Sequence, residues 1–220
     1  MSNPVKVDIW SDIVCPWCFV GKRRFETAAA TFAAEGGEVE VEYHSFELAP
    51  DTPVDFEGSE VDFLVAHKHM PAGQVEQMLA QMTELAAAEG LSYDFDALQH
   101  TNTVKAHELL HFAKTKGRQL DLVERMFSAY FEQGRHVGRI DDLADLAAEI
   151  GLDRDEALAA LTASTHLPDA VADKDQAIAY GISGVPFFVL DRRLGVSGAQ
   201  DPSAFVEALR EASNHAGASA

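Results

Sequence analysis

The sequence predicts an α/β protein whose α/β part is interrupted by an all-helical insertion. Apolar and polar residues alternate, as they do in β-strands, near residues 5–9 and 39–46, and short apolar runs return at 186–190 and 194–197. Between residue 60 and about residue 165, apolar residues recur at helical spacing and strand signals almost vanish. We therefore expect one α/β domain from residues 1–58 and 166–213, a helical insertion at 59–165 and a flexible tail at 214–220.

The N-terminal region reads strand, helix, strand. Val5, Val7 and Ile9 fall on one face of the first strand, and an apolar helical stripe then passes through Cys18 and Phe25. The second strand follows at 39–46. Because a β-α-β crossover joins parallel neighbours, these two strands should pair in parallel.

The middle region contains a series of helices with apolar stripes. We expect them at 61–69, 72–89, 103–116, 120–133, 140–150 and 154–163. Asp153, followed three residues later by Glu156, resembles a capping box at the start of the last of them.

The α/β pattern returns after His166. A helix is expected at 170–180, a loop at 181–184, and two strands at 186–190 and 194–197 joined by a turn at 191–193. Asp201 and Pro202 then mark the start of a final helix.

Cys15-Pro16-Trp17-Cys18 stands where the first strand gives way to the first helix. This places Cys15 at the helix N-terminus and Pro16 at the first helical position, where proline is favoured. The first-turn amides and the helix dipole should make the Cys15 thiol easier to ionise than a free cysteine. Cys18 lies one turn further, within reach of a mixed disulfide formed on Cys15, and Trp17 should shape access to the sulfurs. The pattern therefore predicts a dithiol/disulfide catalyst.

Two other roles for this cysteine pair are weaker. A structural disulfide that closes so short a loop would stabilise the fold only slightly. A zinc half-site would need two more ligands, and the chain holds no second cysteine pair.

His107-Glu108-Leu109-Leu110-His111 matches the H-E-x-x-H pattern of zinc peptidases, on a predicted helix. The extended signature is missing, because FAKTKG follows His111. A third ligand could come from Glu124 or Glu132, so a zinc metallopeptidase stays an alternative. We interpret His107 and His111 as structural, and we expect neither a metal nor a cofactor.

Composition narrows the range of partners. The formal net charge of −19 argues against nucleic acid and against anionic membrane surfaces. The N-terminus carries neither the basic region nor the apolar region of a signal peptide, and no apolar run reaches membrane-spanning length. We therefore expect a cytoplasmic protein, where a cysteine pair is more often catalytic than structural.

Five segments carry a resemblance to a known family. The chain resembles the thioredoxin fold of the DsbA family, in its FrnE-type or 2-hydroxychromene-2-carboxylate isomerase-like branch. The resemblance covers nearly the whole chain, through the segments DIVCPWCFVG, HSFELAP, TNTVKAHELLHFAK, MFSAYFEQGRHVGRIDDLADLA and YGISGVPFFVLDRRLGVSGAQ. It implies a thioredoxin-like α/β domain with a helical insertion, and a protein disulfide oxidoreductase or isomerase.

The resemblance also implies roles for single residues. Cys15 would be the nucleophile and Cys18 the resolving thiol, with Val185 and Pro186 forming a cis-proline loop that faces the dithiol. Pro16, Trp17 and this loop would contact the substrate. Isomerases and kappa-class glutathione transferases of the superfamily use a serine where this chain has Cys15.

The resemblance indicates the chemical class of the substrates but not which substrate is used. It implies protein or small-molecule thiols and disulfides as substrates, handled by a monomer or a homodimer. A proline followed by an aromatic residue between the cysteines is closer to the glutaredoxin pattern, which makes glutathione a candidate co-substrate. A glutathione-linked transferase or isomerase and a non-enzymatic binding module are the alternatives.

Overall fold

The computed structural model describes residues 3–217, with side chains as far as residue 214. The chain forms two compact units, which we call the sheet unit, residues 3–46 and 173–217, and the helical unit, Glu47–Ala172. The predicted fold class, an α/β protein with a helical insertion, is confirmed. The insertion was predicted at 59–165, whereas the helical unit spans Glu47–Ala172. Which parts of the chain fold together remains a prediction.

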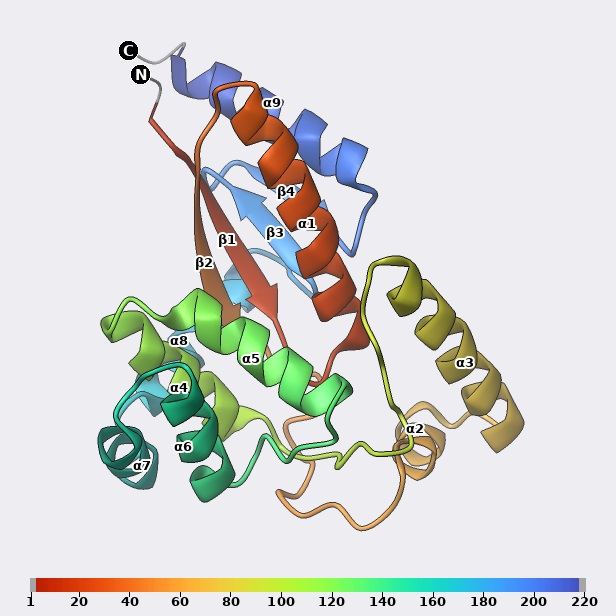
Figure 1. Cartoon of the computed structure of the whole chain (residues 1–220). Coiled ribbons are helices and arrows are strands. Elements are labelled where there is room, and N and C mark those ends of the chain that lie inside the picture. The colour runs from red at the N-terminus through yellow and green to blue at the C-terminus, as the bar shows by residue number, and fades with distance from the viewer. Residues whose placement is uncertain (1–2, 218–220) are drawn as a thin grey trace. The chain divides into compact units, whose positions relative to one another are not determined.

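Four strands form the sheet, in the order β2-β1-β3-β4 (Figure 1). They are β1 (Val5–Ser11), β2 (Val39–Ser45), β3 (Phe187–Leu190) and β4 (Leu194–Ser197). As the β-α-β pattern predicted, β1 and β2 pair in parallel, with Ile9 opposite Tyr43. β3 runs antiparallel to β1 and also to β4, to which a tight turn joins it.

One face of the sheet is covered by α1 (Pro16–Ala34) and α9 (Pro202–Gly217), which also pack against each other. Three buried phenylalanines meet there: the ring of Phe25 lies 5.4 Å from that of Phe188 and 5.6 Å from that of Phe205. Burial of three such side chains makes this the core that anchors α1, the helix that carries the cysteines.

The C-terminal helix is longer than expected. α9 continues to Gly217, so the predicted flexible tail at 214–220 begins inside a helix, and residues 218–220 lie outside the described residues. α8 (Leu167–Ala179) likewise begins three residues before the predicted position.

The helical unit contains six of the predicted helices, each within three residues of its expected limits. They are α2 (Glu60–Lys68), α3 (Ala72–Ala88), α4 (Val104–Thr115), α5 (Gln119–Phe131), α6 (Ile140–Glu149) and α7 (Arg154–Thr162). α4 packs against α5, α6 and α7, while α2 packs against α3. The predicted cap at α7 is present, since the Asp153 side chain accepts a hydrogen bond from the Glu156 N–H at 2.9 Å.

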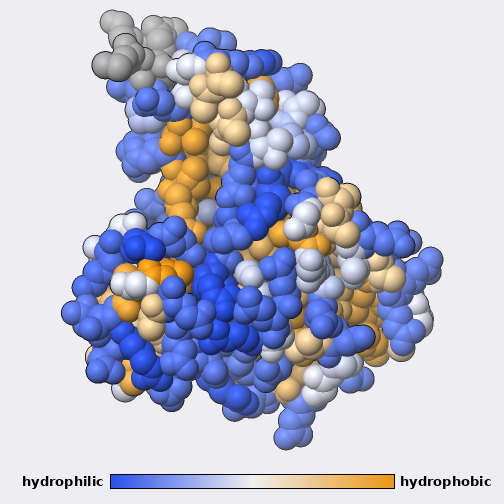
Figure 2. Space-filling model, viewed as in Figure 1, coloured by the Kyte–Doolittle hydropathy of each residue, from blue (hydrophilic) through white to orange (hydrophobic). Residues whose placement is uncertain are grey.

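The surface is predominantly polar. Hydrophilic residues cover most of the face seen in Figure 2, and apolar patches interrupt them in both its upper and its lower part. Among the described residues, no helix combines the length and the apolar character that a membrane span requires.

Candidate active site

The two cysteines lie at the start of α1, as predicted. Cys15 is the N-cap residue and Pro16 occupies the first helical position. The Cys15 N–H donates to the Asp12 carbonyl at 3.1 Å, and the Cys18 N–H donates to the Cys15 carbonyl at 3.0 Å. These two bonds fix the approach of the chain to the helix and set both sulfurs on its first turn.

The two thiols are free and shielded, while the residue between them is open. Cys15 is 4% exposed and Cys18 is 2% exposed, whereas Trp17 is 45% exposed. The indole of Trp17 therefore presents an apolar surface to solvent between the two shielded thiols.

Burial raises the pKa of the Cys18 thiol well above its ordinary value. A hydrogen bond with Cys15 and the charge of Cys15 add to this effect, and the side chain of Ser11 partly opposes it. Cys18 therefore stays a neutral thiol over the physiological pH range, and a thiol in that state is a poor nucleophile.

The Val185–Pro186 peptide bond is cis, which confirms the prediction for this loop. The Cys15 thiol donates to the Val185 carbonyl at an Sγ–O distance of 3.6 Å. Pro186 is buried, and its carbonyl accepts a hydrogen bond from the Gly198 N–H at 2.8 Å. The structure thus brings the Cys15–Cys18 segment and the Val185–Pro186 loop together, although these two segments are far apart in sequence.

Gly21 is a site residue that the sequence analysis missed. A Cβ atom at Gly21 would lie 2.9 Å from Cγ of Pro186 and 3.4 Å from Cβ of Ala199. Glycine therefore allows the Val185–Pro186 loop to approach α1 one turn after Cys18. A glycine inside an otherwise regular helical pattern was the available signal, because such residues often mark a close approach of backbone.

His44 belongs to a second polar group in the sheet unit. Its Nδ1 lies 2.7 Å from Oδ1 of Asp173, and its Nε2 lies 3.0 Å from Oδ1 of Asp8. The imidazole also stacks on the indole of Trp10, with ring centres 4.5 Å apart. Burial works against a charge on His44, but the hydrogen bonds with Asp173 and Asp8 outweigh it and raise its pKa to about 9.

This group connects α8 to the sheet and to the Val185–Pro186 loop. The Trp10 indole N–H donates to the Asp173 carbonyl at 3.0 Å, which ties β1 to α8. Trp10 then packs in a cluster with Ile182 and Val185, two residues of the segment that reaches Cys15. The charged group at His44 therefore supports the loop through one layer of packed side chains.

The H-E-x-x-H segment lies in α4, where His107, Glu108 and His111 are all buried. Glu108 Oε1 accepts a hydrogen bond from Nζ of Lys105 at 2.8 Å. The same ammonium donates to the Leu161 carbonyl at 2.9 Å, at the end of α7. Within the described part of the chain, no three His, Cys, Asp or Glu side chains are grouped so that they could hold a metal ion.

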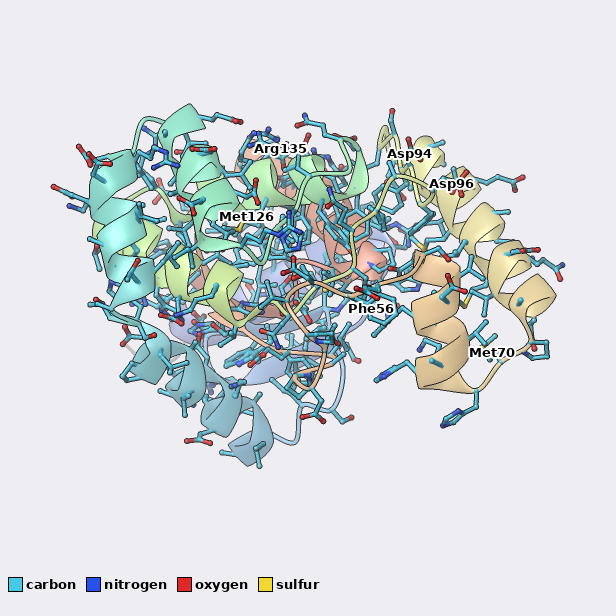
Figure 3. All side chains as sticks on the ribbon, turned by 90° about the horizontal axis from the view of Figure 1, so that it is seen from below. Phe56, Met70, Asp94, Asp96, Met126 and Arg135 are labelled. Atoms are coloured by element: carbon cyan, nitrogen blue, oxygen red, sulfur yellow. The ribbon has the colours of Figure 1, made fainter. Side chains whose placement is uncertain are left out.

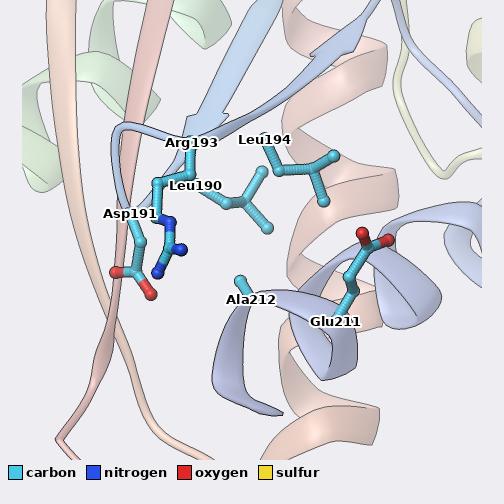
Figure 4. Close-up of a pocket in the computed structure, with 6 residues that line it drawn as sticks. All are labelled: Leu190, Asp191, Arg193, Leu194, Glu211 and Ala212. Carbon is cyan, nitrogen blue, oxygen red and sulfur yellow. The ribbon is translucent and has the colours of Figure 1, made fainter. Parts of the chain in front are cut away.

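A small cavity of about 200 Å³ lies between the β3–β4 turn and α9 (Figure 4). Asp191 and Arg193 line it from the turn, and Glu211 lines it from α9. Leu190, on its wall, ends β3 at the opposite end from Pro186, so the cavity is separate from the cysteines.

Known proteins resemble the chain over nearly its full length. A model of the DSBA-like thioredoxin domain matches residues 6–210. The uncharacterized protein YwbO of Bacillus subtilis (strain 168) is 29% identical over 215 residues, which cover 94% of this chain and 96% of that protein.

Solved structures agree with this match. The crystal structure of the probable DsbA oxidoreductase SCO1869 from Streptomyces coelicolor is 41% identical, with a TM-score of 0.87 over 94% of this chain and 89% of the other. A 2-hydroxychromene-2-carboxylate isomerase shares the fold at 14% identity, with a TM-score of 0.70 over 94% of this chain and 95% of the other. The resemblance proposed from the sequence is confirmed, and the chain belongs to the family of DSBA-like thioredoxin domains.

Proposed function

We propose that the protein is a thiol–disulfide oxidoreductase, with Cys15 as the nucleophile and Cys18 as the resolving thiol. The observation that carries this proposal is the arrangement of the two thiols around the start of α1. Cys15 caps the helix beside the Val185 carbonyl, and Cys18 is buried one turn further with a raised pKa. Two thiols in such different surroundings suit the two separate steps of a disulfide exchange.

In the reducing direction, the Cys15 thiolate attacks one sulfur of a substrate disulfide. A bond forms between Cys15 and that sulfur, the substrate S–S bond breaks, and the other substrate sulfur leaves as a thiolate. This leaving thiolate takes a proton, and Cys18 gives up its own proton as it attacks the Cys15 sulfur. The second substrate thiol then leaves, and the enzyme holds a Cys15–Cys18 disulfide, so two electrons have passed to the substrate. The oxidising direction is the same sequence reversed.

Pro16, Trp17 and the Val185–Pro186 loop are the proposed substrate contacts. The exposed indole of Trp17 offers an apolar surface next to Cys15. Val185 is only half-buried, and its backbone could pair with an extended segment of substrate, which gives affinity without requiring a particular sequence. Protein disulfides are therefore the proposed substrate class, with glutathione as the co-substrate that returns the dithiol to its starting state.

Selective alkylation tests the assignment of the two thiols. At neutral pH, iodoacetamide should modify Cys15 in the reduced protein well before Cys18, as read by mass spectrometry of the digested chain, because the raised pKa of Cys18 keeps that thiol neutral. Faster modification of Cys18 would contradict the proposal.

Two matched variants test the chemistry itself. Cys18→Ser should accumulate a mixed disulfide with glutathione after treatment with glutathione disulfide, while Cys15→Ser should form none. Both variants keep one sulfur and change the other to an isosteric hydroxyl, so each controls for the other. If wild-type protein accelerates neither insulin reduction nor glutathione exchange, the oxidoreductase proposal is wrong.

A further inference from the structure

The helical unit contains a cavity of about 340 Å³ between the loop that follows β2 and the helix α2. One wall is the six-residue loop 48–53, and the other is formed by Phe56 and by residues of α2. Figure 3 shows Phe56 beside α2, seen from below. The lining residues are Leu48, Ala49, Pro50, Asp51, Thr52, Pro53, Phe56, Phe63, Ala66 and His67. A volume of this size is typical of sites for small molecules.

The loop wall is held by side chains from elsewhere in the helical unit. The Asn102 side chain donates to the Pro50 carbonyl at 2.8 Å, and the Asn102 N–H donates to the Pro53 carbonyl at 3.3 Å. The Thr101 hydroxyl donates to the Val54 carbonyl at 2.7 Å. A loop held at the carbonyls of Pro50, Pro53 and the adjoining Val54 does not need to be ordered by a ligand, so the cavity is formed in advance.

His136 adds a further bond to the same wall. Its Nδ1 accepts hydrogen bonds from the Gly138 and Arg139 backbone N–H groups, at 3.0 and 3.1 Å. Nε2 must therefore carry the proton, and it donates to the Val54 carbonyl at 3.0 Å. The Val54 carbonyl, which directly follows the loop, is thus held by two donors, Thr101 and His136.

The helix wall is equally fixed, by a stack of rings. The Phe63 ring lies between the imidazoles of His67 and His100, at 5.2 and 3.4 Å between ring centres. Phe56 meets Phe63 edge-on at 5.6 Å. Oε2 of Glu60 lies 2.8 Å from Nδ1 of His100 and holds this imidazole, which is one end of the stack, in place. Phe63 is therefore confined to one orientation and presents its edge to the cavity.

The charge of the lining favours a cation. Among the described residues that line it, Asp51 is the only carboxylate, His67 is the only imidazole, and neither lysine nor arginine contributes. The net charge of −19 adds a negative field from the rest of the chain, which raises the local concentration of small cations.

We propose that this cavity binds a small molecule with an aromatic body and a protonated amino group. The aromatic body lies among Leu48, the two prolines and the phenylalanines, and the ammonium group pairs with Asp51. None of the residues that line this cavity is among those described at the cysteine site.

Two indoles of opposite charge test the proposal directly. Tryptamine, a cation, should bind with saturation in the sub-millimolar to millimolar range, as measured by ligand-observed NMR and calorimetry with the full-length reduced protein. Indole-3-acetate, an anion of nearly the same shape, should bind about tenfold more weakly, because its carboxylate faces Asp51. Equal affinity for the two compounds, or no saturable binding of tryptamine, overturns the proposal.

Three variants locate the site. Ala66 is exposed on α2 and lines the cavity, so Ala66→Trp should fill it and abolish tryptamine binding while α2 stays folded. Lys68→Trp places the same indole on α2 outside the lining and should leave binding unchanged. Asp51→Asn should keep the aromatic contact but reduce the preference for tryptamine to less than about threefold. If Ala66→Trp and Lys68→Trp bind tryptamine equally well, the ligand lies elsewhere and the assignment is wrong.

Discussion

The charged group around His44 predicts that the sheet unit loses stability as the pH rises above neutrality. The pKa of His44 is raised from the ordinary 6.5 to about 9 in the folded chain. A group whose pKa is raised by folding contributes stability that is complete below its unfolded pKa and vanishes above its folded pKa. The window is therefore pH 6.5 to about 9.

The size of the effect follows from the same two values. Each tenfold change in proton affinity is worth about 1.4 kcal/mol, so this group contributes about 3 kcal/mol below pH 6.5. The His44 side chain is only 14% exposed and bonds to Asp173 and Asp8 at short distance, so solvent screening reduces this figure little. The loss should be steady across the window, at about 1.4 kcal/mol for each pH unit.

Urea unfolding from roughly pH 6 to pH 10 measures this loss. A Trp17→Phe background leaves Trp10 as the single tryptophan, and Trp10 stacks directly on His44, so its fluorescence reports the sheet unit. Replacing Cys15 and Cys18 by serine in the same background removes the titration of the thiols. His44→Gln in this background should be less stable at low pH and should lose the slope. If both proteins show the same slope between pH 6.5 and 9, the reasoning about His44 is refuted.

Two substitutions test packing and a buried charge, each by its effect on the free energy of unfolding. Gly21→Ala should destabilise by about 1–3 kcal/mol because its Cβ meets Pro186 at 2.9 Å, whereas Gly73→Ala, in open space on α3, should stabilise by about 0.5–1 kcal/mol. A stabilised Gly21→Ala would show that the loop moves freely. Lys105→Met should cost about 3–5 kcal/mol by leaving the carboxylate of Glu108, 2% exposed, without its ammonium partner. Adding Glu108→Gln should recover most of that loss, and no recovery would mean that the ion pair is not its cause.

Local patterns in the sequence were enough to predict much of the site. Pro16 after Cys15 signals a helix start because proline lacks the N–H that a first-turn residue leaves unused, and the structure has this arrangement. The apolar run after Pro186 likewise predicts β3. These features depend on residues a few positions apart, so a single sequence carries them.

The contacts between distant segments could not be predicted in this way. Asp173 reaches His44 across 129 positions, and nothing in either segment identifies the other as its partner. From the alternation alone, His44 could face solvent or a neighbour, and only the register of the sheet places it on Trp10. Gly21 was missed for the same reason, because its role depends on Pro186, which lies much later in the sequence.

The link between His44, Ser45 and Asp173 has a consequence for how the chain is connected. The polypeptide leaves the sheet unit after Phe46 and returns to it at Asp173. The helical unit is therefore one continuous segment that contains more than half of the residues. The Ser45 N–H donates to Oδ2 of Asp173 at 2.8 Å, which joins the point of departure to the point of return. The helical unit therefore starts and ends beside a hydrogen bond of the sheet unit, and the entropy cost of closing such a loop grows slowly with its length. A change in the length of the helical unit should therefore alter the entropy cost of closing the loop only slightly, as long as Ser45 and Asp173 keep their bond.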